Sequence, residues 1–294
     1  MIIAGEHFVV HGGLALAVSV DLWASTSAEP APRPSIESVD PPGRCGDDGC
    51  DPFLAPLRAM LDEIVADHPG ASGRYVLRSE IPQARGLGSS AAVAVSLAAA
   101  ALALAEGEAP REEVYRYAMI SERIIHGNPS GVDPAASTYG GAILYSKGKG
   151  MRRLSIREGE LMVCCAPAAR STAAMVERVE EFRRSRGELF EALLASSSAL
   201  VEAAASALES GDRSALAPIM RWHQGALRLL GVSTPELESF VEAMESAGAA
   251  AKLTGAGGGG CVVGLPPVEG VRCGGAPAAR LRYPTGGVES WRLS

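Results

Sequence analysis

The chain has 294 residues, of which 47% are hydrophobic, and its formal net charge is −7. This apolar content excludes a disordered chain, and the length favours two domains. The net negative charge argues against nucleic acid or an anionic membrane surface as the main partner. An anionic ligand would therefore need a local binding site.

The first part of the chain is predicted to begin with strands and to continue mainly as helices. Apolar and β-branched residues predict a hairpin over 8–27, and the prolines and glycines of 28–52 predict a loop. The segments that follow are a helix over 53–68, a strand from Tyr75 towards Ile81, an alanine-rich helix ending near Glu106, a helix over 111–125 and a strand over 142–145.

The second part predicts helices enclosed between strands, with a domain boundary near residue 158. We therefore expect an α+β protein with domains 1–158 and 159–294. The predicted elements are a strand over 161–165, helices over 172–182, 188–210, 213–230 and 235–247, and a strand over 261–265.

The six cysteines show no zinc-ligand spacing, and Cys45 and Cys50 alone cannot complete a tetrahedral site. We expect reduced, structural thiols in a cytoplasmic protein. The first residues lack the basic start and apolar core of a signal peptide. The apolar stretch 91–105 is too short to span a bilayer, so we expect a buried helix and no membrane partner.

A glycine- and serine-rich loop follows a predicted strand and opens a predicted helix. It consists of Gly86, Leu87, Gly88, Ser89, Ser90, Ala91 and Ala92. Unpaired backbone N–H groups and the macrodipole at a helix N-terminus form an anion site, and a serine hydroxyl there can bind Mg²⁺. The pattern is neither a Walker A loop nor Gly-x-Gly-x-x-Gly. The alternative is a tight turn that Ser89 merely caps.

Two further segments favour a ligand site. Residues 252–261 form a glycine-dense turn before an apolar strand, which indicates positive φ angles and a close approach rather than a flexible linker. Glu122 and Asp133 could supply the acidic pair of a phosphoryl-transfer site. Their alternatives are an exposed helix carboxylate for Glu122 and, because Pro134 follows, a helix N-cap for Asp133.

Taken together, these segments resemble the GHMP kinase family, which comprises galacto-, homoserine, mevalonate and phosphomevalonate kinases. Gly5-Glu6-His7 and the residues that follow resemble the substrate segment of that family. The resemblance covers most of 5–145 and again 250–265. It implies an N-terminal α/β domain and a ferredoxin-like C-terminal domain, with the active site in the cleft between them.

The resemblance also implies roles for individual residues. Residues 86–92 would hold the ATP triphosphate with support from Gly257, and Ser90 and Glu122 would bind Mg²⁺. Asp133 would be the catalytic carboxylate. Glu6 and His7 would line the substrate pocket, with Thr172 near it.

Within the family, His7, Asp133 and the run 126–131 favour mevalonate as the substrate. The alternatives are phosphomevalonate or homoserine, or a non-catalytic nucleotide-binding relative; a homodimer is compatible with all of these. The family usually carries a lysine shortly before Gly-Glu-His, whereas no lysine here precedes Lys147. We therefore expect either a missing upstream segment or another cation, with Arg85 a candidate by position.

Overall fold

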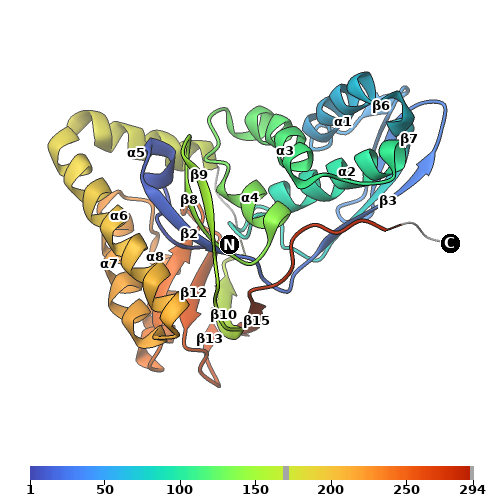
Figure 1. Ribbon diagram of the computed structural model, residues 1–294. Coiled ribbons are helices and arrows are strands. Elements are labelled where there is room, and N and C mark those ends of the chain that lie inside the picture. Colours follow the sequence, from blue (N-terminus) through green and yellow to red (C-terminus); the bar gives the residue numbers. More distant parts are fainter. Residues whose placement is uncertain (168–171, 292–294) are drawn as a thin grey trace. The chain divides into compact units, whose positions relative to one another are not determined.

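The computed structural model describes residues 1–167 and 172–291 (Figure 1). These residues form two compact units that alternate along the sequence. Unit 1 contains 1–21, 83–87 and 141–285, and unit 2 contains 22–82, 88–140 and the C-terminal residues from 286. The domain boundary at residue 158 stays a prediction.

Unit 1 contains a four-stranded antiparallel sheet with the strand order β1-β2-β8-β9. Its strands are β1 (Ile2–Ala4), β2 (Leu14–Val18), β8 (Ala142–Ser146) and β9 (Gly150–Leu154). Residues on both central strands are apolar and buried, and Leu16 lies opposite Leu144. The 3-10 helix η1 (Phe8–His11) lies between β1 and β2 in the sequence.

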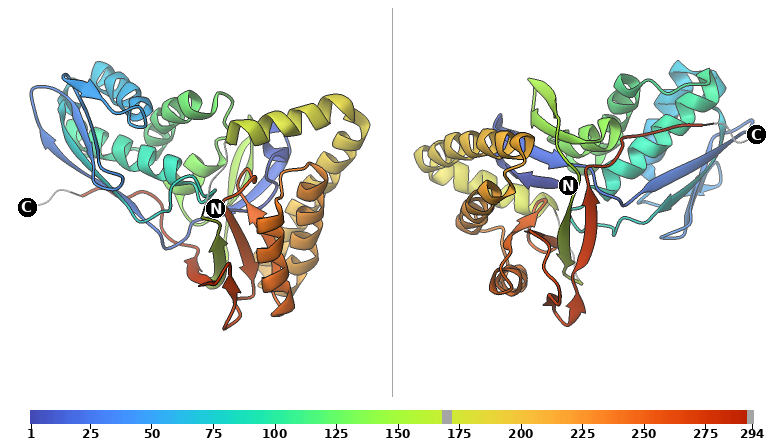
Figure 2. Two further views of the ribbon diagram at one scale, coloured as in Figure 1. Left: turned by 180° about the vertical axis from the view of Figure 1, so that it is seen from behind. Right: turned by 60° about the horizontal axis from the view of Figure 1, so that its bottom comes forward.

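A second antiparallel sheet of unit 1 has the order β11-β12-β10-β15 (Figure 2). It consists of β10 (Gly159–Cys165), β11 (Ala250–Thr254), β12 (Cys261–Leu265) and β15 (Ala279–Tyr283), and β13 (Arg272–Cys273) pairs separately with β14 (Ala276–Pro277). β11 and β12 are buried along their whole length, as their mainly apolar runs predict.

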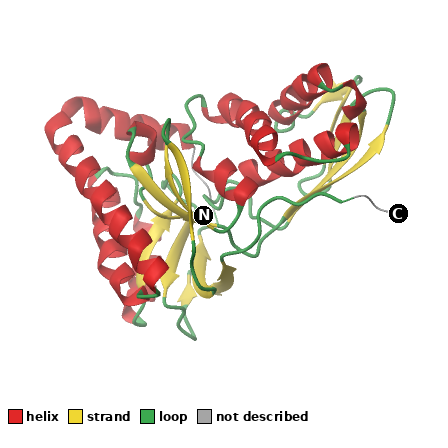
Figure 3. Ribbon diagram, viewed as in Figure 1, coloured by secondary structure: helices red, strands yellow, loops and turns green. Residues whose placement is uncertain are grey.

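The predicted helices of the second half are present in unit 1. They are α5 (Thr172–Ser185), α6 (Gly187–Ser210), α7 (Leu216–Leu229) and α8 (Pro235–Ser246), with a 3-10 turn, η3 (Arg213–Ala215), before α7. α7 and α8 pack on β11, which buries residues such as Leu237 and Leu253 in one core (Figure 3). The Thr234 side chain caps α8 by accepting a bond from the Leu237 N–H.

Unit 2 contains a five-stranded sheet, β3-β7-β4-β5-β6, beside helices. The strands are β3 (Ala24–Pro30), β4 (Ser35–Ser38), β5 (Gly43–Gly46), β6 (Gly49–Cys50) and β7 (Gly73–Ser79), and only the β4–β7 pair is parallel. The helices are α1 (Ala55–Asp67), α2 (Ser89–Glu106), α3 (Arg111–His126) and α4 (Val132–Tyr139), with the 3-10 turn η2 (Pro69–Ala71).

The predictions for residues 8–52 are wrong. β2 pairs with β1 and β8 and not with β3, so 8–27 is not a hairpin. The predicted loop 28–52 contains β4, β5 and β6. Its few apolar residues suffice to form strands because Ile36 and Cys45, each 1% exposed, supply the buried face of the sheet. Pro30 is tolerated because it ends the edge strand β3, where the sheet needs no backbone N–H donor.

Helix α2 matches the predicted buried helix. Both α2 and α6 are long and apolar enough to cross a membrane by length and composition. However, α2 packs against β3, α3 and α4, and its alanine face allows these elements to approach closely. Its apolar residues therefore belong to the core of unit 2.

The expectation of reduced thiols is also wrong, because all six cysteines are disulfide-bonded. Cys45 and Cys50 lie opposite each other on β5 and β6, as do Cys165 and Cys261 on β10 and β12. Adjacent residues of a strand point to opposite faces, so Cys164 turns away from Cys165 and pairs with Cys273. Pairing between residues 96 and 109 positions apart cannot be read from sequence spacing.

The two nested disulfides of unit 1 should be strongly non-additive. While Cys165–Cys261 is closed, breaking Cys164–Cys273 frees only a short additional loop, so Cys164→Ala/Cys273→Ala should lower the free energy of unfolding by about 3 kcal/mol. Removing the second disulfide then opens the whole loop and should cost about 5 kcal/mol more. Urea unfolding of the two double variants and the quadruple variant measures these free energies. If thiol titration found six free thiols in unreduced, denatured protein, the pairing would be contradicted.

Candidate functional site

In unit 2, the glycine- and serine-rich loop leads directly into α2. Gly88, with φ 78°, is the N-cap residue, and the helix begins at Ser89. Ser89 donates its hydroxyl hydrogen to the Ile81 carbonyl at 3.3 Å and does not cap the helix with its side chain. The alternative of a turn capped by Ser89 is therefore wrong, and the N–H groups of Ser89, Ser90 and Ala91 have no side-chain cap. The Ala92 N–H donates to the Gly88 carbonyl at 3.0 Å.

Two acidic side chains of unit 2 lie beside this helix start. Ser90 donates a hydrogen bond to the Glu122 carboxylate on α3. The alternative for Asp133 is wrong, because α4 begins at Val132 with Gly131 as its cap and places Asp133 within the first turn. Asp133 faces Gly88: a Cβ at Gly88 would lie 3.4 Å from Asp133 Oδ1.

Glu122 is buried rather than exposed, so its structural alternative is wrong as well. It is 4% exposed, and Oε1 has no hydrogen-bond partner among the described residues. Oε2 lies 3.6 Å from His126 Nε2. Burial raises the pKa of Glu122 to about 7, with a further contribution from the Asp133 charge and an opposing one from the Ser90 hydrogen bond.

The donor set at this position fits Mg²⁺. The buried, unsatisfied Glu122 oxygen and the Ser90 hydroxyl are hard oxygen ligands, and a divalent cation would offset the repulsion between Glu122 and Asp133. Within 1–167 and 172–291, no group of three or more His, Cys, Asp or Glu side chains could hold a metal ion. That agrees with Mg²⁺, which usually takes one or two carboxylates and completes its shell with phosphate and water.

In unit 1, the glycine turn after β11 is packed too tightly to be a linker. Gly255, Gly257, Gly258, Gly259 and Gly260 all have positive φ angles, as predicted. A Cβ at Gly257 would lie 2.3 Å from the Val232 carbonyl oxygen.

The same turn contacts the first residues of the glycine- and serine-rich loop, which belong to unit 1. A Cβ at Gly86 would lie 2.6 Å from the Thr254 carbonyl oxygen, and one at Gly260 would lie 2.8 Å from that of Arg85. Leu87 is buried next to them in the sequence. The Arg85 guanidinium donates to the Ala166 carbonyl, so this candidate cation already has a partner.

The Gly5-Glu6-His7 turn also belongs to unit 1 and is buried. A Cβ at Gly5 would lie 2.1 Å from the Leu14 carbonyl oxygen, and His7 has the uncommon φ of 62°. His7 Nε2 lies 3.0 Å from the Ala256 carbonyl oxygen. Because a carbonyl only accepts, Nε2 carries the hydrogen and Nδ1 is an acceptor.

His7 is neutral near pH 7. Its pKa is lowered to about 4, mainly by burial; the nearby His11 and Lys252 also lower it, and the hydrogen bond to Ala256 opposes them. The Glu6 carboxylate, 2% exposed, accepts a bond from Lys252 Nζ. Thr172 is the exposed first residue of α5, and its place near a substrate stays a prediction.

Sequence reasoning missed the part that Lys252 plays. The motif marks this lysine only as the start of a glycine turn, yet it is fully buried in β11 and bonded to the predicted substrate segment. The available signal was a lone lysine between the apolar residues Ala251 and Leu253, which burial would force to find an acidic partner.

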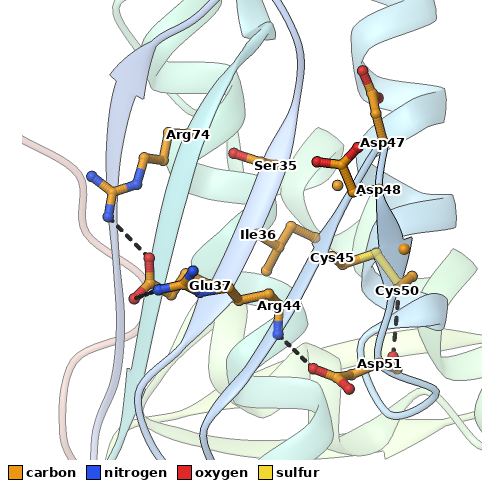
Figure 4. Close-up of a pocket in the computed structure, with 12 residues that line it drawn as sticks. Ser35, Ile36, Glu37, Arg44, Cys45, Asp47, Asp48, Cys50, Asp51 and Arg74 are labelled. Atoms are coloured by element: carbon orange, nitrogen blue, oxygen red, sulfur yellow. Dashed lines mark hydrogen bonds and ion pairs between the residues drawn. A yellow bond between two sulfur atoms is a disulfide. The ribbon is translucent and has the colours of Figure 1, made fainter.

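A separate pocket of about 630 Å³ lies on the β4–β6 part of unit 2 (Figure 4). Its arginines are paired with its own Glu37, which lies 2.9 Å from the Arg74 guanidinium and 3.7 Å from that of Arg44. The Arg44 backbone N–H donates to Asp51 at 2.6 Å. None of the predicted site residues lines it. We assign it no part in the candidate site.

Comparisons with known proteins agree with these motifs. The N-terminal model of the GHMP kinases matches residues 56–141 and the C-terminal model matches 204–271, together just over half of the chain. The chain is 35% identical to the mevalonate kinase of Aeropyrum pernix, covering 90% of this chain and 86% of that protein, and 33% identical to that of Archaeoglobus fulgidus, covering 90% and 89%.

Among solved structures, L. major mevalonate kinase in complex with R-mevalonate matches with a TM-score of 0.78 and 27% identity. The match covers 98% of this chain and 94% of that one. The chain therefore belongs to the GHMP kinase family and has its mixed fold of helices and sheets. The relatives named above are all mevalonate kinases.

Burial of Glu122 predicts a measurable dependence of stability on pH. Its folded pKa of about 7 lies above the usual 4.5, so deprotonation between these values destabilises the unliganded protein as the pH rises. Glu122→Gln removes this charge and should raise the free energy of unfolding at pH 8 by about 2–3 kcal/mol relative to wild type. The gain should be close to zero at pH 4.5.

Urea unfolding of both proteins at several pH values measures this difference, and Glu112→Gln, on the same helix, serves as the control. A gain that does not change with pH would contradict the raised pKa of Glu122.

Proposed function

We propose that this protein is an ATP-dependent mevalonate kinase, which transfers the γ-phosphoryl group of ATP to the primary hydroxyl of mevalonate. The observation that carries the proposal is the Ser90–Glu122–Asp133 cluster at the N-terminus of α2. Its oxygen ligands and uncapped N–H groups are the parts that phosphoryl transfer requires. The named relatives select mevalonate among the family substrates.

In unit 2, the start of α2 binds the phosphates. Its N–H groups donate to the phosphate oxygens, and Gly88 lets the backbone approach them closely. Ser90 and Glu122 would hold Mg²⁺, which neutralises charge on the phosphates when it is bound. Asp133, facing Gly88, orients the substrate hydroxyl and accepts its proton.

In unit 1, the glycine turn supports the loop that approaches the nucleotide. Gly255 and Gly260 contact Gly86 and Arg85 through the backbone, and Gly257 packs the same turn against Val232. His7 keeps its Nδ1 acceptor for a hydroxyl or N–H donor of the substrate. We retain Thr172 as a substrate neighbour, and the buried Glu6 acts next to the pocket through Lys252 rather than as a free carboxylate.

The alternatives differ in substrate or in catalysis. Phosphomevalonate or homoserine kinase activity would use the same loop, whereas a non-catalytic binding relative would not need Asp133. We further propose a cytoplasmic protein that acts on small molecules, without nucleic acid or membrane partners, and a homodimer stays a prediction. Disulfides are uncommon in the cytosol of most organisms, so the thiol titration above also bears on the location.

Asp133→Asn should abolish turnover while leaving nucleotide binding largely intact. The amide keeps the shape but cannot accept the proton, so kcat should fall by about 10²–10⁴-fold. A coupled ADP-release assay with mevalonate, phosphomevalonate, homoserine and galactose measures turnover, and calorimetry with a non-hydrolysable ATP analogue measures affinity.

Wild-type turnover with another of these substrates would move the protein within the family. Absence of turnover with all four, together with nucleotide binding, would favour the non-catalytic relative. Activity of Asp133→Asn within a few-fold of wild type would remove Asp133 from the reaction.

Gly86→Ala should weaken nucleotide binding by more than the strain of a positive φ angle alone would cause. Its φ is 77°, and the added Cβ would collide with the Thr254 carbonyl oxygen, which displaces the loop. Gly211→Ala is the matched control, because Gly211 has φ 79° at the end of α6 and its Cβ would meet no atom within 4 Å. Both variants carry the positive-φ cost of about 1 kcal/mol in stability, but only Gly86→Ala should lose affinity for the ATP analogue. Equal affinities would contradict the role of this contact.

A further inference from the structure

Lys252 forms a fully buried ion pair in unit 1. Its side chain is 0% exposed and that of Glu6 is 2% exposed, and Nζ donates both to Glu6 Oε1 and to the Leu253 carbonyl at 2.6 Å. Burial lowers the pKa of Lys252, while Glu6 favours its charged form. Placing charges in a core is costly, and packed apolar residues would often do as well for stability alone, so this pair invites a functional explanation.

The pair is one of three side-chain bonds between the same two segments. Thr254 Oγ1 donates to the Ile2 carbonyl at 2.9 Å, and His7 Nε2 donates to the Ala256 carbonyl at 3.0 Å. Residues 2–7 and 252–256 are thereby tied together at three points. Lys252 joins them where the chain leaves β1 and enters the turn that carries His7.

The same segment fixes the glycine turn. β11 is also anchored to α7, since the Leu253 N–H donates to Gln224 Oε1 at 2.9 Å. Directly after it, a Cβ at Gly255 would lie 2.7 Å from Gly86 Cα. A displacement of β11 at Lys252 would therefore move both the turn that contains His7 and the backbone that supports Gly86.

We propose that Lys252 is a positioning residue that, through Glu6, sets the substrate turn and the nucleotide loop of unit 1 in register with each other. Lys252 touches neither ligand, because it is fully buried. The inference rests on the proposed function for the identity of the two ligands. It adds a residue to which neither the loop motifs nor the acidic cluster assigns a part.

The test compares Lys252→Met with the double variant Lys252→Met/Glu6→Gln. The single variant leaves a buried carboxylate without its cation and should lower the Tm, whereas the double variant removes both charges and should regain most of the Tm. Both should lose about 100-fold in kcat/KM for mevalonate, because neither neutral pair holds the two turns in register. Leu208→Ala, a buried change near the end of α6, is the control: a lower Tm with unchanged kcat/KM.

Two readouts separate positioning from stability. Affinity for a non-hydrolysable ATP analogue, measured without mevalonate, should fall about 10-fold in both Lys252 variants, although the lysine does not reach the nucleotide loop. The ¹⁵N shifts of His7, which report a hydrogen fixed on Nε2 in the wild type, should indicate mixed tautomers in both.

Wild-type affinity and wild-type His7 shifts in the folded double variant would overturn the proposal. Failure of both variants to fold would also overturn it, because the pair would then be a requirement of the fold itself. If wild-type protein turned over none of the four substrates, the proposed kinase function would fail. The nucleotide affinities and His7 shifts would still decide whether Lys252 acts as a positioning residue.

Discussion

The close approach between the backbone at Gly86 and the backbone at Thr254–Gly255 constrains much of unit 1, because no side chain larger than hydrogen fits between them. That contact fixes how far the first residues of the glycine- and serine-rich loop can extend. It also requires β11 to end where it does, so that the chain can turn through several positive φ angles before β12. The buried Lys252–Glu6 pair and the Thr254–Ile2 bond then set the N-terminal segment against the same strand.

Electrostatic repulsion is the corresponding constraint in unit 2. Glu122 is buried beside Asp133 with one oxygen unsatisfied, an arrangement that costs free energy in the unliganded protein. Ser90 offsets part of this cost, and a divalent cation would offset more. Burial and like charges that perturb a pKa at the expense of stability are typical of functional sites.

The two units thus supply complementary parts of one proposed chemistry. Unit 2 contributes the helix N-terminus and the carboxylates, and unit 1 contributes the glycine turn and a neutral His7. The nested disulfides of β10 reinforce the sheet from which the glycine turn emerges, since Cys261 directly follows Gly260. In unit 2, Ser90 lies at the start of the core helix α2, and in unit 1 the glycine turn connects the buried strands β11 and β12.

The sequence by itself determined most helices, the strands β10 and β12 and the four motifs, because apolar periodicity and glycine or serine spacing are local properties of the chain. It could not determine which strands pair, so the hairpin over 8–27 and the loop over 28–52 were wrong. It also could not reveal the disulfides, whose partners are mostly distant along the chain. Tertiary structure alone decided that Glu122 is buried, that Asp133 lies inside a helix turn and that Lys252 meets Glu6. Each of these depends on the packing of segments far apart in sequence, and burial in turn sets the charge, the pKa and the partners of these residues.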